Sequence, residues 1–231
     1  MRTAAVVPAA GRGERLGPGA PKALRELGGV PILVHAVRAL ARARSVDVVV
    51  VAAPAEEVEA VRALLVDQQI DAEVEVVAGG ATRQASVARA VASLAEDIDV
   101  VLVHDAARPL VPVELVDAVA AAIRAGADAV IPVLPVADTI KRVAAGVVES
   151  TLDRASLRAV QTPQGFRRAV LANAHAAGDG GAATDDAGLV EAIGVPVSVV
   201  EGSAEAFKVT RPIDLMLAEA VLAHRRAAGV R

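Results

Sequence analysis

Short runs of β-branched apolar residues alternate with segments of helical spacing along the first half of the chain, and few folds accommodate this alternation. Most of these runs are dominated by apolar residues, as expected for a strand that is covered on both faces, whereas residues 73–77 alternate less cleanly. The pattern predicts an α/β fold built on a single doubly wound, mostly parallel sheet. We expect strands at residues 4–7, 46–52, 73–77, 100–103 and 129–133, and helices at residues 31–44, from Pro54 onward, up to residue 94 and at 112–125.

The composition limits both the core and the chemistry. Of 231 residues, 54% are hydrophobic and 1% aromatic, so the core of a single domain over residues 1–231 must consist of Val, Leu, Ile and Ala. The chain has no Cys, which excludes disulfides, thiol nucleophiles and cysteine-bound metals. The net charge of −4 argues against nucleic acid and anionic membranes as partners.

Targeting signals are not expected from this sequence. No apolar run approaches the ~18 residues that would span a bilayer. Charges begin at Arg2, with Arg12 soon after, so we expect no signal peptide. The predicted location is the cytoplasm.

The first predicted strand runs into a loop rich in glycine and proline that also carries cations. Small residues let backbone N–H groups approach phosphate oxygens, and Arg and Lys add the full charges that backbone dipoles lack. We therefore expect a phosphate site here. The glycine spacing fits neither a Walker loop nor a dinucleotide fingerprint, and the alternative is an ordinary turn with solvated cations. The candidate residues are Ala9, Ala10, Gly11, Gly13, Arg15 and Lys22.

Two further predicted turns lie at carboxyl ends of strands, where doubly wound sheets bind ligands. One is the glycine turn that contains Gly80 and Ser86. The other follows the fourth predicted strand and contains Asp105 and Arg108. A carboxylate in this position commonly binds a divalent metal or a sugar hydroxyl, and an Arg binds an anion. The alternative is a mutual surface ion pair between Asp105 and Arg108.

Short β-like pieces replace the alternation between about residues 134 and 161, with Gly146 between the first two. They predict an antiparallel hairpin that projects from the sheet as an arm and embraces a second subunit, with a loose surface excursion as the alternative. Thr139 and Arg154 lie on this arm; from its position alone Arg154 would be a solvated cation.

The chain after the arm is predicted to return to helices and strands. We expect helices at residues 167–177, at 185–193 with Thr184 as N-cap, and from Pro212, and strands at 197–200 and 207–209.

Six stretches together resemble the 2-C-methyl-D-erythritol 4-phosphate cytidylyltransferase family, and their order and spacing match it from end to end. One departure is that Ala23 and Leu24 follow Lys22, where many members have Gln and an aromatic residue. The stretches are Ala9-Ala10-Gly11-x-Gly13-x-Arg15-Leu16 with Pro21-Lys22, His104-Asp105-Ala106-Ala107-Arg108-Pro109, Asp138-Thr139-Ile140-Lys141, Thr162-Pro163-Gln164, Thr184-Asp185 and Lys208-Val209-Thr210-Arg211-Pro212.

The resemblance implies an activity and a role for each candidate residue. Such enzymes join CTP to 2-C-methyl-D-erythritol 4-phosphate with the help of Mg²⁺, release pyrophosphate, and serve non-mevalonate isoprenoid synthesis. It further implies a homodimer in which the arm completes the partner's site. Arg15, Lys22, Arg154 and Lys208 would be catalytic; Ala9, Ala10, Gly11, Gly13, Gly80, Ser86 and Asp105 would bind the nucleotide; Asp105, Arg108, Thr139, Arg154, Thr184 and Lys208 would bind the acceptor, with Asp105 also near Mg²⁺.

Three other functions are weighed against this one. A ribitol 5-phosphate cytidylyltransferase would share the nucleotide site and differ in the acceptor pocket, where Ala106-Ala107 favours methylerythritol phosphate. A dinucleotide oxidoreductase is disfavoured by the glycine spacing and by the absence of Tyr. A non-catalytic nucleotide sensor would bind CTP and release no pyrophosphate.

Overall fold

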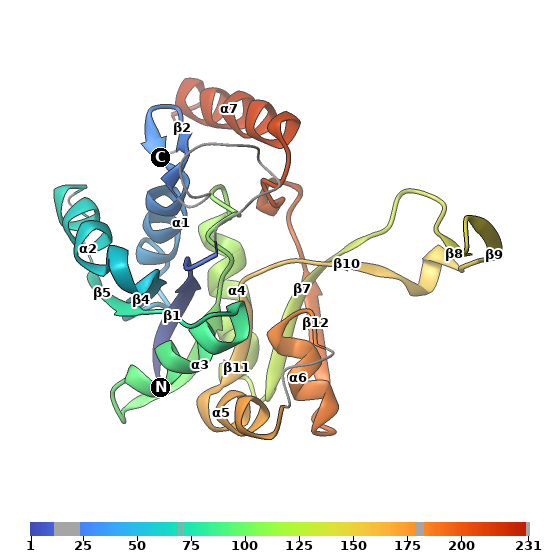
Figure 1. The fold of residues 1–231 in the computed structure, drawn as a ribbon, viewed down its shortest axis with the longest axis horizontal. Helices are drawn as coiled ribbons and strands as arrows, with labels where there is room; N and C mark the ends of the chain where they lie inside the picture. Colours follow the sequence, from blue (N-terminus) through green and yellow to red (C-terminus); the bar gives the residue numbers. More distant parts are fainter. Residues whose placement is uncertain (12–23, 69, 71, 179–182, 230–231) are drawn as a thin grey trace.

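The computed structural model describes residues 1–11, 24–68, 70, 72–178 and 183–229. At its centre lies an eight-stranded sheet of order β10-β7-β11-β6-β1-β4-β5, in which β12 pairs with β7 (Figure 1). The strands are β1 (Arg2–Pro8), β4 (Val48–Ala53), β5 (Glu73–Ala78), β6 (Ile98–Val103), β7 (Ala129–Pro135), β10 (Arg158–Val160), β11 (Gln164–Arg167) and β12 (Val197–Glu201).

Four strands in the N-terminal half are mutually parallel. β1 pairs with both β4 and β6, and β4 pairs with β5. Their carboxyl ends therefore meet at one edge of the sheet, as the alternating sequence predicted. β12 adds a further parallel pair at β7.

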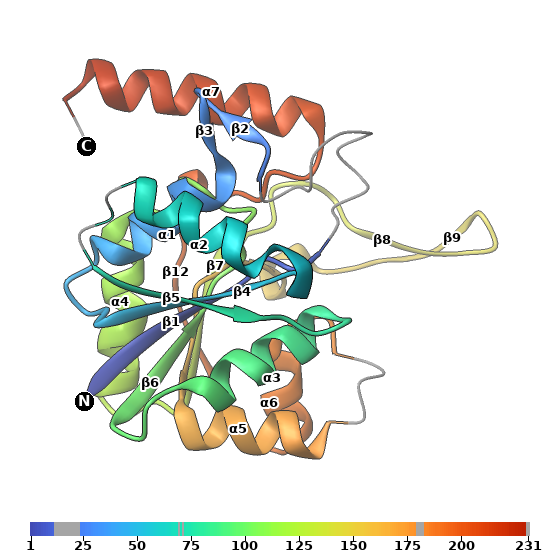
Figure 2. The ribbon, with the colours of Figure 1, turned by 60° about the vertical axis from the view of Figure 1, so that its left-hand side comes forward.

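Helices cover both faces of the sheet, as Figure 2 shows. One face carries α1 (Ile32–Ala41), α2 (Val58–Asp67), which follows the 3₁₀ turn Ala55–Glu57, and α4 (Val113–Arg124). The other carries α3 (Arg83–Ser93), α5 (Arg168–Ala177) and α6 (Asp186–Ala192). This double cover is the doubly wound architecture that the sequence predicted.

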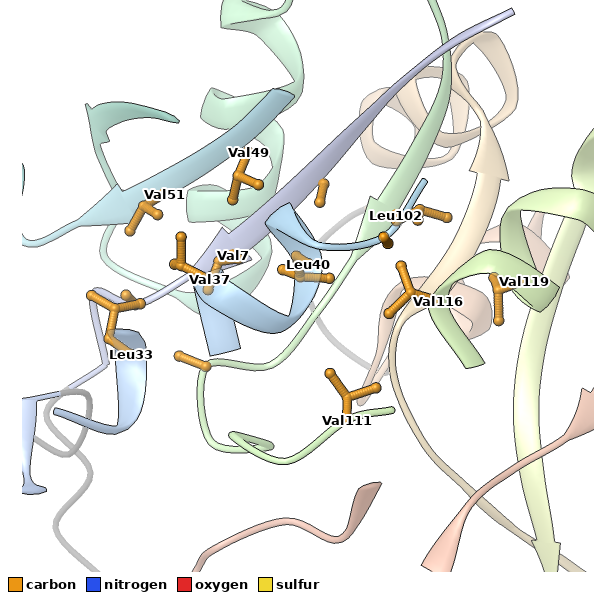
Figure 3. Packing of buried hydrophobic residues seen from close by; sticks show 14 of the residues in the cluster. Val7, Leu33, Val37, Leu40, Val49, Val51, Leu102, Val111, Val116 and Val119 are labelled. Carbon is orange, nitrogen blue, oxygen red and sulfur yellow. The ribbon is translucent and has the colours of Figure 1, made fainter. Parts of the chain in front are cut away.

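The two-residue period of the strands divides the core between the two faces. In β1, Ala5 and Val7 face the α1 side, whereas Ala4 and Val6 face the α3 side, and all four are fully buried. β4 and β6 alternate in the same way. Figure 3 shows aliphatic side chains of the α1 side packed together, and Phe166 is the aromatic residue that enters the opposite side.

Strand β11 is a feature that the sequence analysis did not predict. It lies between β6 and β7 and pairs antiparallel with both. A Cβ on Gly165 of this strand would lie 2.6 Å from Cγ1 of Val119, so glycine lets α4 pack closely onto the sheet. The predicted helix at 167–177 is confirmed as α5, one residue shorter at its start.

The arm projects from the body, as Figure 1 shows, and its hairpin consists of β8 (Lys141–Ala144) and β9 (Val147–Thr151). Ala145 and Gly146 both have positive φ at its turn, the geometry of a tight β-hairpin. Every residue of the two strands is exposed. The predicted hairpin is thus confirmed, but the third piece of the arm, β10, pairs with β7 in the main sheet.

Three local predictions need correction. Asp185, rather than Thr184, caps α6, because its carboxylate accepts a hydrogen bond from Gly188 N at 3.0 Å. The segment 207–209 is no strand; after the 3₁₀ turn Ala204–Ala206 it crosses the loop after β6, where Val209 N donates to Ala107 O at 2.8 Å. The helix expected at 31–44 ends at Ala41.

The C-terminal helix α7 (Pro212–Ala227) packs on a small third cluster with β2 (Glu26–Leu27) and β3 (Val30–Pro31). β2 and β3 form a hairpin that the sequence analysis missed, with Gly28 and Gly29 both at positive φ. Throughout the ranges that the structure describes, no helix combines the length and the apolarity needed to cross a membrane.

Candidate active site

A cavity of about 220 Å³ opens where the parallel strands β1 and β6 end, beside the first turn of α3. Three predicted ligand-binding segments converge there: the start of the first loop, the glycine turn before α3 and the turn after β6. The described residues that line it are Pro8, Ala9, Ala10, Gly11, Gly80, Ala81, Thr82, Arg83, Ser86, Asp105, Ala106, Ala107 and Lys208.

The glycine turn is shaped by hydrogen bonds to Ser86 and Thr82. Gly80 N donates to Ser86 Oγ at 3.0 Å, and Ser86 Oγ donates to Thr82 O at 2.9 Å. Thr82 caps α3 by accepting from Ala85 N at 3.0 Å. A Cβ on Gly80 would lie 2.9 Å from the carbonyl carbon of Ala85, so only glycine fits against the helix here.

Asp105 is held between two cations. Arg83 Nε donates to Oδ1 at 3.1 Å, and Lys208 Nζ donates to Oδ2 at 2.7 Å. The Asp105 backbone N–H donates to Thr162 Oγ1 at 3.1 Å. Burial alone would raise the pKa of Asp105, but Arg83 and Lys208 outweigh it and hold this pKa well below its usual range. The carboxylate is therefore ionised whenever the protein is folded near neutral pH.

A second carboxylate fixes Arg83 from the other side. Arg83 Nη1 donates to Asp186 Oδ2 at 2.7 Å, and His175 Nε2 lies 3.0 Å from Asp186 Oδ1. The side chains of Asp186 and His175 are 1% and 6% exposed, so this link from α5 and α6 is inside the protein. Arg83 thus bridges a buried acid and an acid of the cavity.

Arg108 points away from the cavity lining. Its guanidinium donates to Ala206 O at 2.6 Å and to Val160 O at 3.2 Å, and the residue is 9% exposed. Burial lowers the pKa of Arg108 and that of His104, the latter to about 4. The neutral ring of His104 contacts Arg108 O and Thr162 Oγ1, both at 3.1 Å. These contacts fix the turn after β6, and the acceptor role of Arg108 stays a prediction.

The site residues predicted from the sequence fall into three groups according to where they lie. Ala9, Ala10, Gly11, Gly80, Ser86, Asp105 and Lys208 come together at the cavity. Thr139 and Arg154 lie on the arm, where Arg154 Nη1 donates to Ala137 O at 2.6 Å, and Thr184 is exposed just before α6. Gly13, Arg15 and Lys22 lie outside the described residues.

Arg83 is the charged residue of the described cavity lining that the sequence analysis missed. It is the first residue of α3, where the positive end of the helix dipole disfavours a cation, and the first turn holds no acid. An Arg in that position therefore indicates a carboxylate elsewhere in the fold, and two are present here. This placement was the available signal in the sequence.

The protein groups suit a metal that arrives with a nucleotide. Among the described residues no three His, Cys, Asp or Glu side chains cluster as a metal cage. Asp105 is the single acid among the described lining residues, and it is ionised. Mg²⁺ is commonly bound by one or two carboxylates together with substrate phosphates, so Asp105 fits such an ion.

A doubly wound sheet whose strand ends carry a glycine-lined cavity with paired cations defines a nucleotide-binding α/β protein. Comparison with known families gives the particular group. The family model described as 2-C-methyl-D-erythritol 4-phosphate cytidylyltransferase matches residues 3–224. The chain belongs to this family, and the resemblance drawn from its motifs is confirmed.

Relatives and solved structures agree with this assignment. The 2-C-methyl-D-erythritol 4-phosphate cytidylyltransferase of Frankia casuarinae is 62% identical over 223 residues, covering 96% of this chain and 82% of the relative. That of Streptomyces coelicolor is 56% identical over 234 residues, covering 97% and 86%. The crystal structure of the Thermus thermophilus enzyme of the same name superposes with a TM-score of 0.76 at 40% identity, covering 96% of this chain and 100% of that one.

Proposed function

We propose that this chain transfers a cytidylyl group from CTP to 2-C-methyl-D-erythritol 4-phosphate and releases pyrophosphate, as a step of non-mevalonate isoprenoid synthesis. The observation that carries the proposal is Asp105, ionised between Arg83 and Lys208 in a cavity at the carboxyl ends of β1 and β6. Membership in the family supports the choice of both substrates. Both are charged metabolites that do not cross bilayers unaided, so we place the reaction in the cytoplasm.

In this reaction an oxygen of the acceptor phosphate bonds to the α-phosphorus of CTP, and the bond from that phosphorus to the bridging oxygen breaks. The chain's task is to position the reactants and to stabilise the charge that develops. Backbone N–H groups of Ala10 and Gly11 are assigned to the triphosphate, and Gly80 with Ser86 to the nucleoside. Ala9 lines the same wall of the cavity, and its own N–H donates to Ala52 O at 2.8 Å. Arg15 and Lys22 are assigned to the developing charge on the triphosphate.

Asp105 and Lys208 are assigned to the junction of the two substrates. Asp105 would hold Mg²⁺, directly or through water, and the ion would neutralise phosphate charge. Lys208, whose side chain is 38% exposed, can turn from Asp105 toward an acceptor phosphate. In this assignment Lys208 pairs first with Asp105 and then with the acceptor phosphate.

The acceptor side of the site is proposed to be completed by the arm of a second copy. Arg154 and Thr139 are the acceptor ligands on the arm, and neither lines the cavity of its own chain. The hairpin also exposes Val143, Val147 and Val148, each at least 55% exposed, which is the surface that a partner would cover. We therefore propose a homodimer.

Pyrophosphate release from CTP and Mg²⁺ tests the activity. We expect release with 2-C-methyl-D-erythritol 4-phosphate and little with ribitol 5-phosphate assayed in parallel. Release with ribitol 5-phosphate alone would keep the nucleotide site and replace the acceptor. Release with neither acceptor, but with measurable CTP binding, would favour a nucleotide sensor.

Mixing two inactive variants tests the shared site. If Arg154 serves the partner's cavity, Arg154→Ala and Lys208→Ala should each be nearly inactive alone. Equal mixing should then restore roughly a quarter of wild-type activity, because half of the dimers are mixed and one of their two sites is intact. The measurement is pyrophosphate release after the mixture has been incubated to exchange subunits. Absence of recovery despite proven exchange would place Arg154 in the site of its own chain.

A further inference from the structure

One carboxylate oxygen of Asp105 is held far more firmly than the other. Oδ1 accepts from Arg83 Nε at 3.1 Å, and Arg83 is itself fixed by Asp186 at 2.7 Å. Oδ2 accepts from Lys208 Nζ at 2.7 Å, and no other contact of that ammonium group is found within the described residues. A planar guanidinium with two carboxylate partners is restrained in orientation, whereas a lysine side chain rotates easily.

The buried anchor of Arg83, and not the exposure of Arg83 itself, makes this difference, since the side chains of Arg83 and Lys208 are 32% and 38% exposed. The side chain of Asp186 is 1% exposed, and its other oxygen contacts His175, which is 6% exposed. Breaking a buried, hydrogen-bonded ion pair leaves an uncompensated charge and is strongly unfavourable. The side chain of Lys208 is 38% exposed, so water can replace its contact with Asp105 at little loss. Arg83 therefore stays in place under conditions that release Lys208.

We propose that Arg83 is a positioning residue for the cytidylyl transfer: anchored by Asp186, it holds Oδ1 of Asp105 and leaves Oδ2 as the oxygen that exchanges Lys208 for the ligand. The inference rests on the proposed function and assigns a task to α5 and α6, which contribute no residue to the described lining of the cavity. Once a ligand takes the place of Lys208 at Oδ2, Lys208 would be free for the acceptor phosphate, and Arg83 would keep the carboxylate from rotating.

The alternative is that Arg83 binds the nucleotide phosphates directly, since it also lines the cavity. The two roles differ in their dependence on Asp105. A residue that acts through Asp105 loses its effect when Asp105 is replaced, whereas a direct phosphate ligand does not. A double-mutant cycle separates them.

The experiment measures CTP binding with Mg²⁺ by calorimetry, and pyrophosphate release, for Arg83→Met in the wild-type and Asp105→Asn backgrounds. We expect Arg83→Met to weaken binding and kcat/KM by about 10- to 100-fold in the wild-type background. In the Asp105→Asn background the same change should alter CTP binding by less than about twofold. Equal losses in both backgrounds, or no loss in the wild-type background, would overturn the proposal.

Two further variants guard against a general loss of structure. Asp186→Asn keeps the guanidinium and weakens its anchor, so we expect a smaller loss that also vanishes in the Asp105→Asn background. Arg168→Met is the matched control, because Arg168 bridges α5 to Leu94 O and Ala95 O, away from Asp105, and it should leave CTP binding unchanged. Thermal unfolding identifies variants that fail to fold. The binding measurements need no acceptor, so they remain decisive if the proposed acceptor is wrong.

Discussion

Asp105→Asn is expected to lower kcat/KM for CTP by about 10²-fold, because the cavity loses the single acid among its described lining residues. The same change should not weaken CTP binding when this binding is measured without metal. The amide removes one negative charge from a cavity that faces a triphosphate, and Lys208 becomes free to attract it, whereas Arg83 stays paired with Asp186. Calorimetry with and without Mg²⁺, together with pyrophosphate release, measures both effects.

Asp117→Asn is the matched control for loss of a carboxylate. Asp117 lies in α4 and accepts hydrogen bonds from Ser45 N at 3.0 Å and Ser45 Oγ at 2.7 Å. Ser45 precedes the first residue of β4, so this contact lies at the edge of the sheet opposite the cavity. Its replacement should alter folding stability by about 1 kcal/mol and leave kcat/KM unchanged. Wild-type activity in Asp105→Asn would remove Asp105 from the active site.

Adding one methyl group to Gly80 should have the second large effect. A Cβ there would overlap Cβ of Ala85, so the glycine turn or the start of α3 must move. We expect Gly80→Ala to lower the free energy of unfolding by about 1–3 kcal/mol. CTP affinity should fall by at least about tenfold, because Arg83 and Ser86 on the same helix lose their positions at the cavity. Chemical denaturation and calorimetry are the measurements.

Gly11→Ala gives the contrasting result. A Cβ on Gly11 meets nothing within 4 Å among the described residues, so the free energy of unfolding should change by less than about 0.5 kcal/mol. CTP affinity should still fall if the Gly11 backbone approaches the phosphates. Full affinity in Gly11→Ala would place the triphosphate away from this part of the loop.

Local signals in the sequence sufficed for the parallel half of the fold. β1, β4 and β6 each contain at least four consecutive apolar residues, and helices alternate with the strands along the chain, so period and length identify them. β5 alternates Glu with Val and was recognised from its position between two helices. Strand β11 was missed because it has four residues, includes Gly165 and lies directly before α5. Its place between β6 and β7 is set by pairing with residues 35 to 67 positions earlier, which no local pattern encodes.

The candidate site divides in a similar way. Gly80 and Asp105 were predictable because each lies in the turn that follows a recognisable strand, and Ser86 because it lies in the first turn of the helix after Gly80. The partnership of Arg83 with Asp105 and Asp186 joins positions 22 and 103 residues apart, and it depends on how α3 and α6 pack. The position of Arg108 in the sequence does not reveal that its guanidinium turns toward the backbone carbonyls of Ala206 and Val160, and its acceptor role stays a prediction.

The antiparallel insertion of β11 also bears on how the chain is made. Synthesis from the N-terminus completes β1, β4, β5 and β6 long before residues 164–167 leave the ribosome. During that interval β6 is an edge strand, and its unpaired backbone groups can pair with other chains. The side chains of Val101 and Val103, which are buried in the folded protein, are then exposed as well. The last strand to enter the middle of the sheet therefore ends the period in which the nascent protein is most prone to aggregate.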